Sequence, residues 1–339
     1  MKALLRMVAA LILLLLLIGG VLLWQVSTID DSLLITDSES VEYEVARGSN
    51  ANTVLRDWQA KGWLQASPWW RLWLKLHPRE ADIKAGSYLI KRGEPVKHVL
   101  YRMWAGDVIH YSVTLIEGWN IRDVRAALAK APKLGQTLAV TTDAELMAAL
   151  GKPGIHPEGQ FFPSTYSYTE TMTDRELLAE AMRVMDTVLA AEWARRQPGL
   201  PYTSASEALI MASIVEKETG RASDRYDIAG VFVRRLDKNM RLQTDPTVIY
   251  GLGEKFDGNL RKIDLQADSP YNSYTRAGLP PSPICMAGRE AIQAALNPAP
   301  GDALYFVARG DGTTVFSATL EQHNAAVREF QLKRRGRGR

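Results

Sequence analysis

Residues 204–220 have the sequence SASEALIMASIVEKETG, and this stretch decides how the second half of the chain folds. Ser204 and Glu207 have the Ser-x-x-Glu spacing of a capping box, which predicts the start of a helix. Gly220 predicts its end, because glycine adopts the left-handed backbone that commonly follows a helix. We therefore expect one helix across most of this stretch.

The apolar face of this helix continues into a carboxylate. At about 100° per residue, Met211, Ile214 and Val215 lie on one stripe, Glu218 extends it, and Glu216 falls on the opposite side. Desolvation beside an apolar face raises the pKa of a carboxyl group and makes it a proton donor near neutral pH, as a glycosidase acid must be. Glu218 is therefore our candidate acid/base. The alternative is a solvated residue at a frayed helix end.

The N-terminus predicts a membrane anchor. Residues 7–26, MVAALILLLLLIGGVLLWQV, carry no charge, and a helix of that length spans about 30 Å, the thickness of the hydrocarbon core of a bilayer. Lys2 and Arg6 precede it, while Asp30 and Asp31 follow it. The basic end, residues 1–6, should stay in the cytoplasm, so the rest of the chain should face outward. A cleaved signal peptide is the alternative.

Composition and charge exclude several functions. The 339 residues are 46% hydrophobic and 23% charged, as in ordinary globular domains. Without the five basic residues of the tail and the two before the apolar run, the formal charge of +3 becomes −4, which argues against nucleic-acid binding. Cys285 is the single cysteine, and the five histidines show no HExxH spacing. We therefore expect no disulfide within the chain, no metal and no cofactor.

The first half predicts a small module after a linker. Residues 27–40 are polar and predict the linker, and residues 41–116 form the module with its connecting elements. Its expected elements are a strand through Val41, Tyr43 and Val45, a helix through Val54, Leu55 and Trp58 that Ser49 or Asn50 could cap, a helix over 67–76, a strand over 85–90, a helix over 95–104 that starts at Pro95, and a strand over 108–116. The β-α-α-β order resembles a LysM module, which binds glycans containing N-acetylglucosamine. We expect its tryptophans to form core rather than a sugar platform.

The second half predicts a mixed α/β domain over residues 117–330. A turn at 117–120 leads into a helix over 121–131, residues 133–200 are expected to be mostly helical, and residues 331–339 form a basic, solvated tail. The predicted fold class is therefore α+β, with a transmembrane helix, a LysM-like module and a catalytic domain whose acid/base glutamate lies on a helix.

Four ordered blocks resemble one known family. Residues 212–219 (ASIVEKET) are similar to the signature of the YceG-like family, the endolytic murein transglycosylases also called MltG. The other blocks are 158–166 (EGQFFPSTY), 241–251 (RLQTDPTVIYG), and 269–274 (SPYNSY) with 278–281 (GLPP). Ser164, Ser282 and residues 285–288 depart from the family pattern, but these departures lie in loops. The resemblance covers nearly the whole chain.

The resemblance implies a lyase that cleaves the β-1,4 bond between N-acetylmuramic acid and N-acetylglucosamine and leaves a 1,6-anhydro end. Glu218 would protonate the leaving oxygen and then take a proton from the muramoyl C6 hydroxyl, while the substrate's own N-acetyl group stabilises C1. The implied substrate-binding residues are Gln243, Thr244, Asp245, Tyr250, Asn272, Tyr274 and Glu158. As residues alone, most of them are ordinary turn builders, and Glu158 could instead cap a helix.

Two alternative functions remain at this point. One is a two-carboxylate muramidase, in which Asp245 or Glu216 helps water attack. The other is a non-catalytic, membrane-tethered scaffold that binds peptidoglycan. In either case the expected location is the bacterial inner membrane, crossed once, with the catalytic domain on the periplasmic side. The anchor further suggests nascent glycan strands as substrate, so that cleavage terminates strand elongation, and penicillin-binding synthases as partners.

Overall fold

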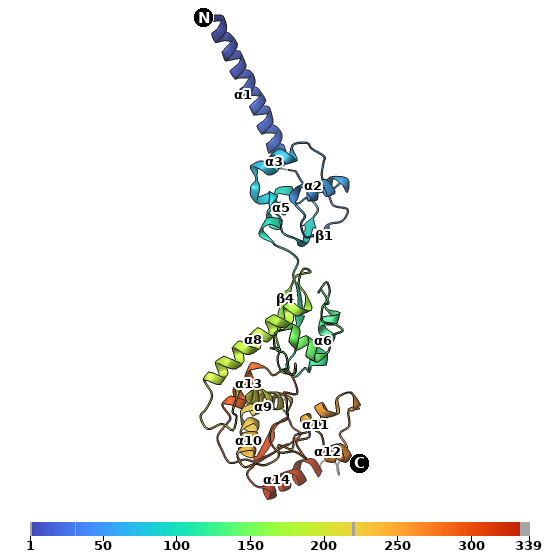
Figure 1. Cartoon of the computed structure of the whole chain (residues 1–339), viewed down its shortest axis with the longest axis vertical. Helices are drawn as coiled ribbons and strands as arrows, with labels where there is room; N and C mark the ends of the chain where they lie inside the picture. The colour runs from blue at the N-terminus through green and yellow to red at the C-terminus, as the bar shows by residue number, and fades with distance from the viewer. Residues whose placement is uncertain (1, 31, 219–220, 333–339) are drawn as a thin grey trace. The chain divides into compact units, whose positions relative to one another are not determined.

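The structure is a computed structural model that describes residues 2–30, 32–218 and 221–332 (Figure 1). It contains helices and short two-stranded sheets, as the predicted α+β class requires. The chain divides into two compact units. Unit 1 comprises Met1–Tyr111, Lys133–Gly135 and Ser167–Met172, and unit 2 comprises Ser112–Pro132, Gln136–Tyr166 and Thr173–Arg339. No sequence signal had suggested the two short additions to unit 1.

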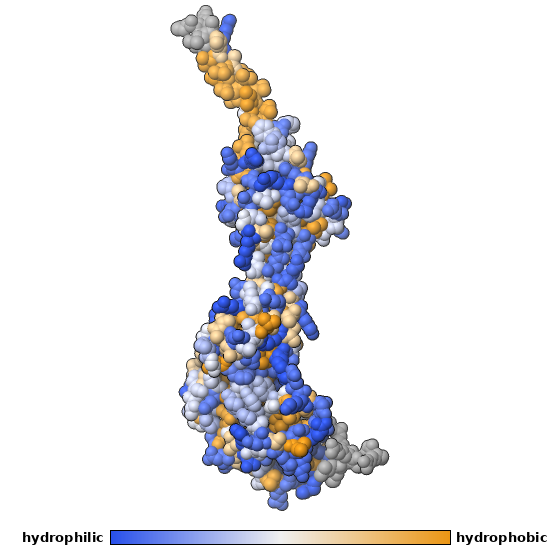
Figure 2. Space-filling model, turned by 45° about the vertical axis from the view of Figure 1, so that its right-hand side comes forward, coloured by the Kyte–Doolittle hydropathy of each residue, from blue (hydrophilic) through white to orange (hydrophobic). Residues whose placement is uncertain are grey.

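The N-terminal helix α1 (Lys2–Asp30) is the one described helix apolar and long enough to cross a membrane. The qualifying stretch is Arg6–Ile29, 24 residues, or about 36 Å of helix. Figure 2 shows its hydrophobic side chains exposed along its length. This helix fits a single-pass membrane anchor. It continues beyond the predicted end at residue 26, and Ile29 is buried in the core of unit 1.

Residues 27–40 do not form the free linker that the sequence predicted. The first four belong to α1, and the side chains of Leu34 and Thr36 are fully buried. The main chain of Leu34 accepts a hydrogen bond from Gly93 N at 2.7 Å and donates one to Glu94 O at 3.0 Å. Because every second side chain of this extended stretch points inward, a polar composition concealed a segment of the unit 1 core.

Unit 1 contains the two predicted strands, with one helix more between them than the β-α-α-β order predicts. Strands β1 (Ser40–Val45) and β2 (Gly86–Lys91) pair antiparallel along their whole length. Between them lie α2 (Ala51–Ala60), α3 (Trp70–Leu76) and the short α4 (Pro78–Ala81), and α5 (Val96–Ala105) follows β2. Asn50 is the residue that caps α2, by accepting a hydrogen bond from Thr53 N at 3.1 Å. Pro95 is the N-cap of α5, so the helix begins one residue later than predicted.

The tryptophans of unit 1 form core, as expected. Trp58 and Trp73 are fully buried, and Trp63 and Trp70 nearly so. Tyr43 packs edge-on against Trp58 with ring centroids 5.6 Å apart. These side chains hold the two helices against the sheet.

Unit 2 is mostly helical. Its helices are α6 (Ile121–Lys130), α7 (Asp143–Ala149), α8 (Asp174–Ala194), α9 (Ala205–Glu218), α10 (Arg225–Asp237), α11 (Asp245–Leu252), α12 (Lys262–Gln266), α13 (Arg289–Leu296) and α14 (Leu320–Val327), with shorter turns at Ala222–Asp224, Gly253–Lys255 and Arg328–Leu332. Strands β5 (Tyr305–Ala308) and β6 (Thr314–Ser317) pair antiparallel. Strand β3 (Tyr111–Thr114), shorter than predicted, pairs with β4 (Thr165–Tyr168), which the mostly helical prediction for 133–200 missed.

Helix α9 lies at the centre of unit 2. It contacts α8, α10, α11 and α13, and every residue from Ala208 to Val215 is buried (Figure 1). The single apolar stripe predicted from the sequence was therefore wrong, because a helix that is apolar all round is buried all round. Its small residues, Ala208, Ala212 and Ser213, make room for close packing. Ser204 caps the helix as predicted, since Glu207 N donates to Ser204 Oγ at 3.3 Å, but the Glu207 carboxylate accepts from Thr203 N at 2.6 Å, so the capping box is only half formed.

We predict that Leu34→Ala destabilises unit 1 by about 2–4 kcal/mol, because it removes a buried side chain and leaves a cavity. The matched control is Ile35→Ala, which truncates a side chain that is 63% exposed and should change stability by less than about 0.5 kcal/mol. Urea unfolding of the detergent-solubilised chain, followed by tryptophan fluorescence, measures both. Equal effects of the two substitutions would show that residues 32–36 are a linker after all.

Candidate active site

Glu218 ends the described part of α9, with its side chain mostly buried. The Thr244 hydroxyl donates a hydrogen bond to Glu218 Oε1. The pKa of Glu218 is raised above the ordinary value, chiefly by burial and also by the charge of Asp245, while the Thr244 bond and the charge of Arg235 oppose the rise. The raised pKa makes Glu218 a better proton donor than a solvated glutamate.

Thr244 is held by a segment far away in the sequence. Thr244 N donates to Ser273 Oγ at 3.0 Å, and Gln243 N donates to Ser273 O at 3.1 Å. Gln243 has a φ of 51°, in the left-handed region that residues other than glycine rarely adopt. Thr247 Oγ1 donates to Thr244 O at 2.8 Å. These bonds hold the Thr244 side chain against Glu218.

A second carboxylate and two cations surround this pair. Tyr274 OH donates to Asp245 Oδ1 at 2.5 Å, and Arg241 Nη1 donates to Tyr274 O at 2.9 Å. Burial, followed by Asp245, raises the pKa of Tyr274, so the phenol stays a donor. The Arg235 guanidinium is buried and donates to the carbonyl oxygens of Leu304 at 2.7 Å and Leu242 at 2.8 Å.

Glu216, which the helical pattern places on the side opposite the apolar stripe, is buried as well. Its side chain is only 6% exposed, Oε2 accepts a hydrogen bond from Gly288 N at 2.9 Å, and Oε1 lies 3.4 Å from Arg225 Nη2. Burial raises the pKa of Glu216, and the Gly288 N–H and the Arg225 charge oppose it. Both carboxylate oxygens thus hold α9 to α10 and to the start of α13.

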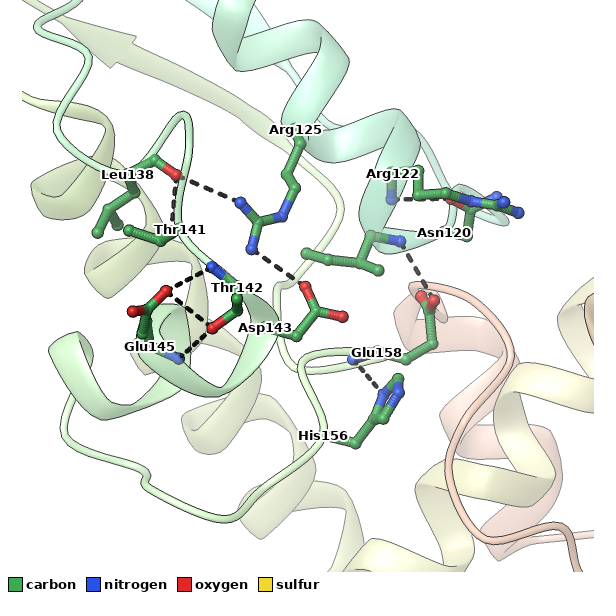
Figure 3. Close-up of polar contacts among 11 residues, drawn as sticks. Asn120, Arg122, Arg125, Leu138, Thr141, Thr142, Asp143, Glu145, His156 and Glu158 are labelled. Atoms are coloured by element: carbon green, nitrogen blue, oxygen red, sulfur yellow. Dashed lines mark hydrogen bonds and ion pairs between the residues drawn. The ribbon is translucent and has the colours of Figure 1, made fainter. Parts of the chain in front are cut away.

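Glu158 lies at a second location, where its side chain has no exposed surface. Figure 3 shows its carboxylate pointing to the start of α6, and Ile121 N there donates to Oε2 at 3.2 Å. Burial raises the pKa of Glu158 to about 7, and Ile121, Tyr250 and Gly159 oppose the rise. His156 Nδ1 accepts a hydrogen bond from Glu158 N at 3.1 Å and fixes the loop.

Tyr250 connects Glu158 to a neighbouring aromatic pair. It interacts with Glu158, and its ring packs edge-on against Tyr271 with centroids 4.8 Å apart. The Tyr271 hydroxyl is hydrogen-bonded to Ser282 Oγ at 2.7 Å.

The Asn272 side chain is buried and bonded to main chain. Its Nδ2 donates to carbonyl oxygens of residues 264, 265 and 267, at 2.7 Å for the last, and its Oδ1 accepts from Tyr274 N at 2.8 Å. These bonds fit the turn-building alternative for Asn272.

The predicted site residues therefore fall into two groups. Glu218, Thr244, Asp245 and Tyr274 form one chain of contacts, with Gln243 beside it. Glu158 and Tyr250 form a separate pair. Sequence reasoning missed Arg235, because an arginine within a helix carries no signal that it is buried. It also gave no role to Ser273, which positions Thr244.

Comparison with known proteins assigns a family. The model of the YceG-like family matches residues 43–329. The chain belongs to the YceG-like family. The resemblance inferred from the four sequence blocks is thereby confirmed.

This YceG-like chain has close relatives of known name. An endolytic murein transglycosylase of Bacillus subtilis (strain 168) is 32% identical over 333 residues, which cover 93% of this chain and 91% of that protein. One of Streptococcus pneumoniae serotype 2 (strain D39 / NCTC 7466) is 28% identical, and the match covers 88% of this chain but only 60% of that protein. A crystal structure of a YceG-like protein of Listeria monocytogenes superposes with a TM-score of 0.55 at 31% identity, over 85% of this chain and 98% of that one.

We predict that burial of Glu158 makes the free energy of unfolding of this YceG-like chain fall as the pH rises. Between the ordinary pKa of 4.5 and the folded value of about 7, the folded state holds the proton more tightly than the unfolded state. Wild type should therefore lose about 3 kcal/mol relative to Glu158→Gln between those pH values. Urea unfolding at a series of pH values measures this loss.

Glu254→Gln is the matched control for this measurement, because the Glu254 side chain is 89% exposed. Its pH dependence should parallel that of wild type. If Glu158→Gln also paralleled wild type, Glu158 would be ionised in the folded chain at neutral pH.

Proposed function

We propose that this chain is an endolytic peptidoglycan lytic transglycosylase, a lyase that acts on murein glycan strands. Family membership supports this, as do the Bacillus and Streptococcus relatives, which are named endolytic murein transglycosylases. The observation that carries the proposal is the desolvated carboxyl group of Glu218 at the end of a buried helix, with the Thr244 hydroxyl on one oxygen.

Glu218 serves in turn as acid and as base. When protonated, Glu218 donates its proton to O4 of the N-acetylglucosamine residue. This oxygen leaves as its bond to C1 of the muramoyl residue breaks. The substrate's N-acetyl group stabilises the charge at C1. Ionised, Glu218 takes the proton of the C6 hydroxyl, whose oxygen bonds to C1 and closes the 1,6-anhydro ring. The proton count balances, and no water is consumed.

The surroundings of Glu218 suit both proton transfers. Burial and Asp245 favour the protonated form that must donate, whereas Thr244 and Arg235 favour the carboxylate that must accept. Neither form is so stable that the other is inaccessible, which is the condition for a group that acts as acid and base in successive steps.

The other site residues have different roles in this proposal. Gln243 and Asp245 are exposed and Tyr274 is partly so, which leaves them open to sugar hydroxyls and acetamido groups. Thr244 orients Glu218. Asn272 shapes the loop that carries Tyr274. Glu158 and Tyr250 bind substrate only if the strand reaches their buried pair.

One observation keeps a muramidase as the second candidate. Asp245 is close enough to influence the pKa of Glu218, so it could act as the base that activates water. Glu216 suits that role less well, because Gly288 and Arg225 occupy its two oxygens. Product ends separate the two reactions, since hydrolysis leaves a reducing end.

We further propose that α1 anchors the enzyme in the inner membrane with unit 2 on the periplasmic side. A LysM-like unit 1 would bind glycan, the substrate would be nascent strand, and penicillin-binding synthases would be partners. The support is the single described helix that fits an anchor. A soluble form released from the membrane that controlled strand length as well as the anchored protein would contradict this arrangement.

We predict that Glu218→Gln lowers the rate of strand cleavage by about a thousandfold or more, because amide cannot supply the proton. The measurement is digestion of purified glycan strands, with product ends identified by mass spectrometry. Anhydro ends should form with wild type only. Glu216→Gln is the matched control on the same helix, and it should lower stability while keeping anhydro-ended products.

If Glu218→Gln still produced anhydro ends at the wild-type rate, Glu218 would not be the acid/base. If neither wild type nor variant cleaved nascent or mature strands, the scaffold function would be favoured instead.

We predict opposite shifts of the pH profile from two neighbouring substitutions. The alkaline limb of the rate reports loss of the Glu218 proton. Thr244→Val removes the bond that stabilises the carboxylate, so the limb should move to higher pH. Asp245→Asn removes a negative charge that favours the proton, so the limb should move to lower pH. Shifts in the same direction would mean that the limb reports another group.

A further inference from the structure

Unit 1 carries a groove of about 840 Å³. All of the charged side chains that line it are cationic. Arg56 lines it from α2, and Arg71 and Lys75 line it from α3. Arg71 and Lys75 are four residues apart, so they lie on one face of that helix. Within the described part of the chain, no carboxylate forms an ion pair with any of the three. The groove therefore holds uncompensated positive charge.

The neutral amide side chains of the groove, Asn50, Asn52 and Gln59, carry donor nitrogens. Asn50 Oδ1 is already occupied by Thr53, so its free polar atom is the amide nitrogen.

Apolar side chains line the groove as well, beside the neutral polar residues Asn52, Gln59 and Ser67. Leu55, Trp70 and Leu74 line it, and all three belong to the core of unit 1. Cations and donors beside an apolar surface match an amphiphile with an anionic head.

The position of the groove in unit 1 favours a membrane lipid. Helix α3, which carries Arg71 and Lys75, contacts α1. Ile29, near the end of α1, is buried in the same core as Trp70 and Leu74. The groove therefore belongs to the folded unit into which the apolar helix runs, within reach of lipid headgroups at the end of that helix.

We propose that this groove binds the phosphate group of a membrane phospholipid, with Arg56, Arg71 and Lys75 on the phosphate and the glycerol and upper acyl chain on the apolar side. Bound lipid then fixes the orientation of unit 1 on the bilayer surface, beyond what a single helix provides. The groove does not depend on the catalytic role proposed for Glu218.

A neutral glycan fits the groove less well. It brings no anion for the three cations Arg56, Arg71 and Lys75. Stem peptides of the cell wall do carry carboxylates, so they are a competitor that the test must include.

The experiment titrates the full chain, solubilised in an uncharged maltoside detergent, with dihexanoyl phosphatidylglycerol and measures bound lipid by native mass spectrometry. The variant is Arg71→Gln with Lys75→Gln, and binding should weaken by about tenfold to thirtyfold, at about 1 kcal/mol for each basic residue near a phosphate. The matched control, Lys91→Gln with Lys97→Gln, removes the same charge from unit 1 outside the groove and should bind as wild type.

Arg56→Gln provides a second test, because it removes the third cation of the groove. It should weaken lipid binding by about threefold to tenfold, at about 1 kcal/mol for a basic residue near a phosphate, with circular dichroism unchanged. Equal binding by wild type and by both groove variants would overturn the proposal.

Competitors identify the source of the anion. Inorganic phosphate should compete only at far higher concentration than the lipid, because it lacks the apolar part. Equal competition would assign the groove to free phosphate and overturn the lipid. Displacement of the lipid by a peptide-bearing glycan fragment that binds more tightly, with the same loss in Arg71→Gln with Lys75→Gln, would make it a cell-wall site instead.

Discussion

The all-round burial of α9 is the constraint on which unit 2 depends. A helix whose residues from Ala208 to Val215 are all covered must be enclosed by its neighbours, and α8, α10, α11 and α13 do this. The enclosure reaches the last turn, so Glu216 and Glu218 lose water that a surface helix would leave them. Ionising a buried carboxyl group is expensive without partners. The surrounding loops are arranged largely to supply those partners.

Glu216 and Glu218 have different hydrogen-bond and charge partners, and these partners suit different roles. Glu216 has an N–H and a guanidinium on its two oxygens, which is the arrangement of a fixed, ionised brace. Glu218 has one hydroxyl, a guanidinium acting at a distance and a repelling carboxylate. A site that left Glu218 as well satisfied as Glu216 would be more stable and would donate protons poorly. In the proposed mechanism, this weaker set of partners leaves Glu218 able to exchange its proton.

The sequence predicted local features well and burial poorly. Caps at Asn50 and Ser204, the two strands of unit 1 and the family blocks are properties of neighbouring residues, and the structure or the comparisons confirm them. Whether a face meets water depends on what packs on it, so the single stripe on α9 was wrong, and the burial of Glu216 was missed. The buried alternation around Leu34 and the strand β4 were missed for the same reason. Their partners lie far away in the sequence, at Gly93 and in β3.

The role of Asp245 decides whether Glu218 alone can account for both proton transfers. Tyr274 donates to its Oδ1 at 2.5 Å. The charge of Asp245 raises the pKa of Glu218, which favours the protonated form that the proposed mechanism needs in its first step. The same charge would also suit a base for water, but a base is needed only if water enters. With the muramoyl C6 hydroxyl held against C1, the nucleophile belongs to the substrate, and Asp245 needs only to tune Glu218.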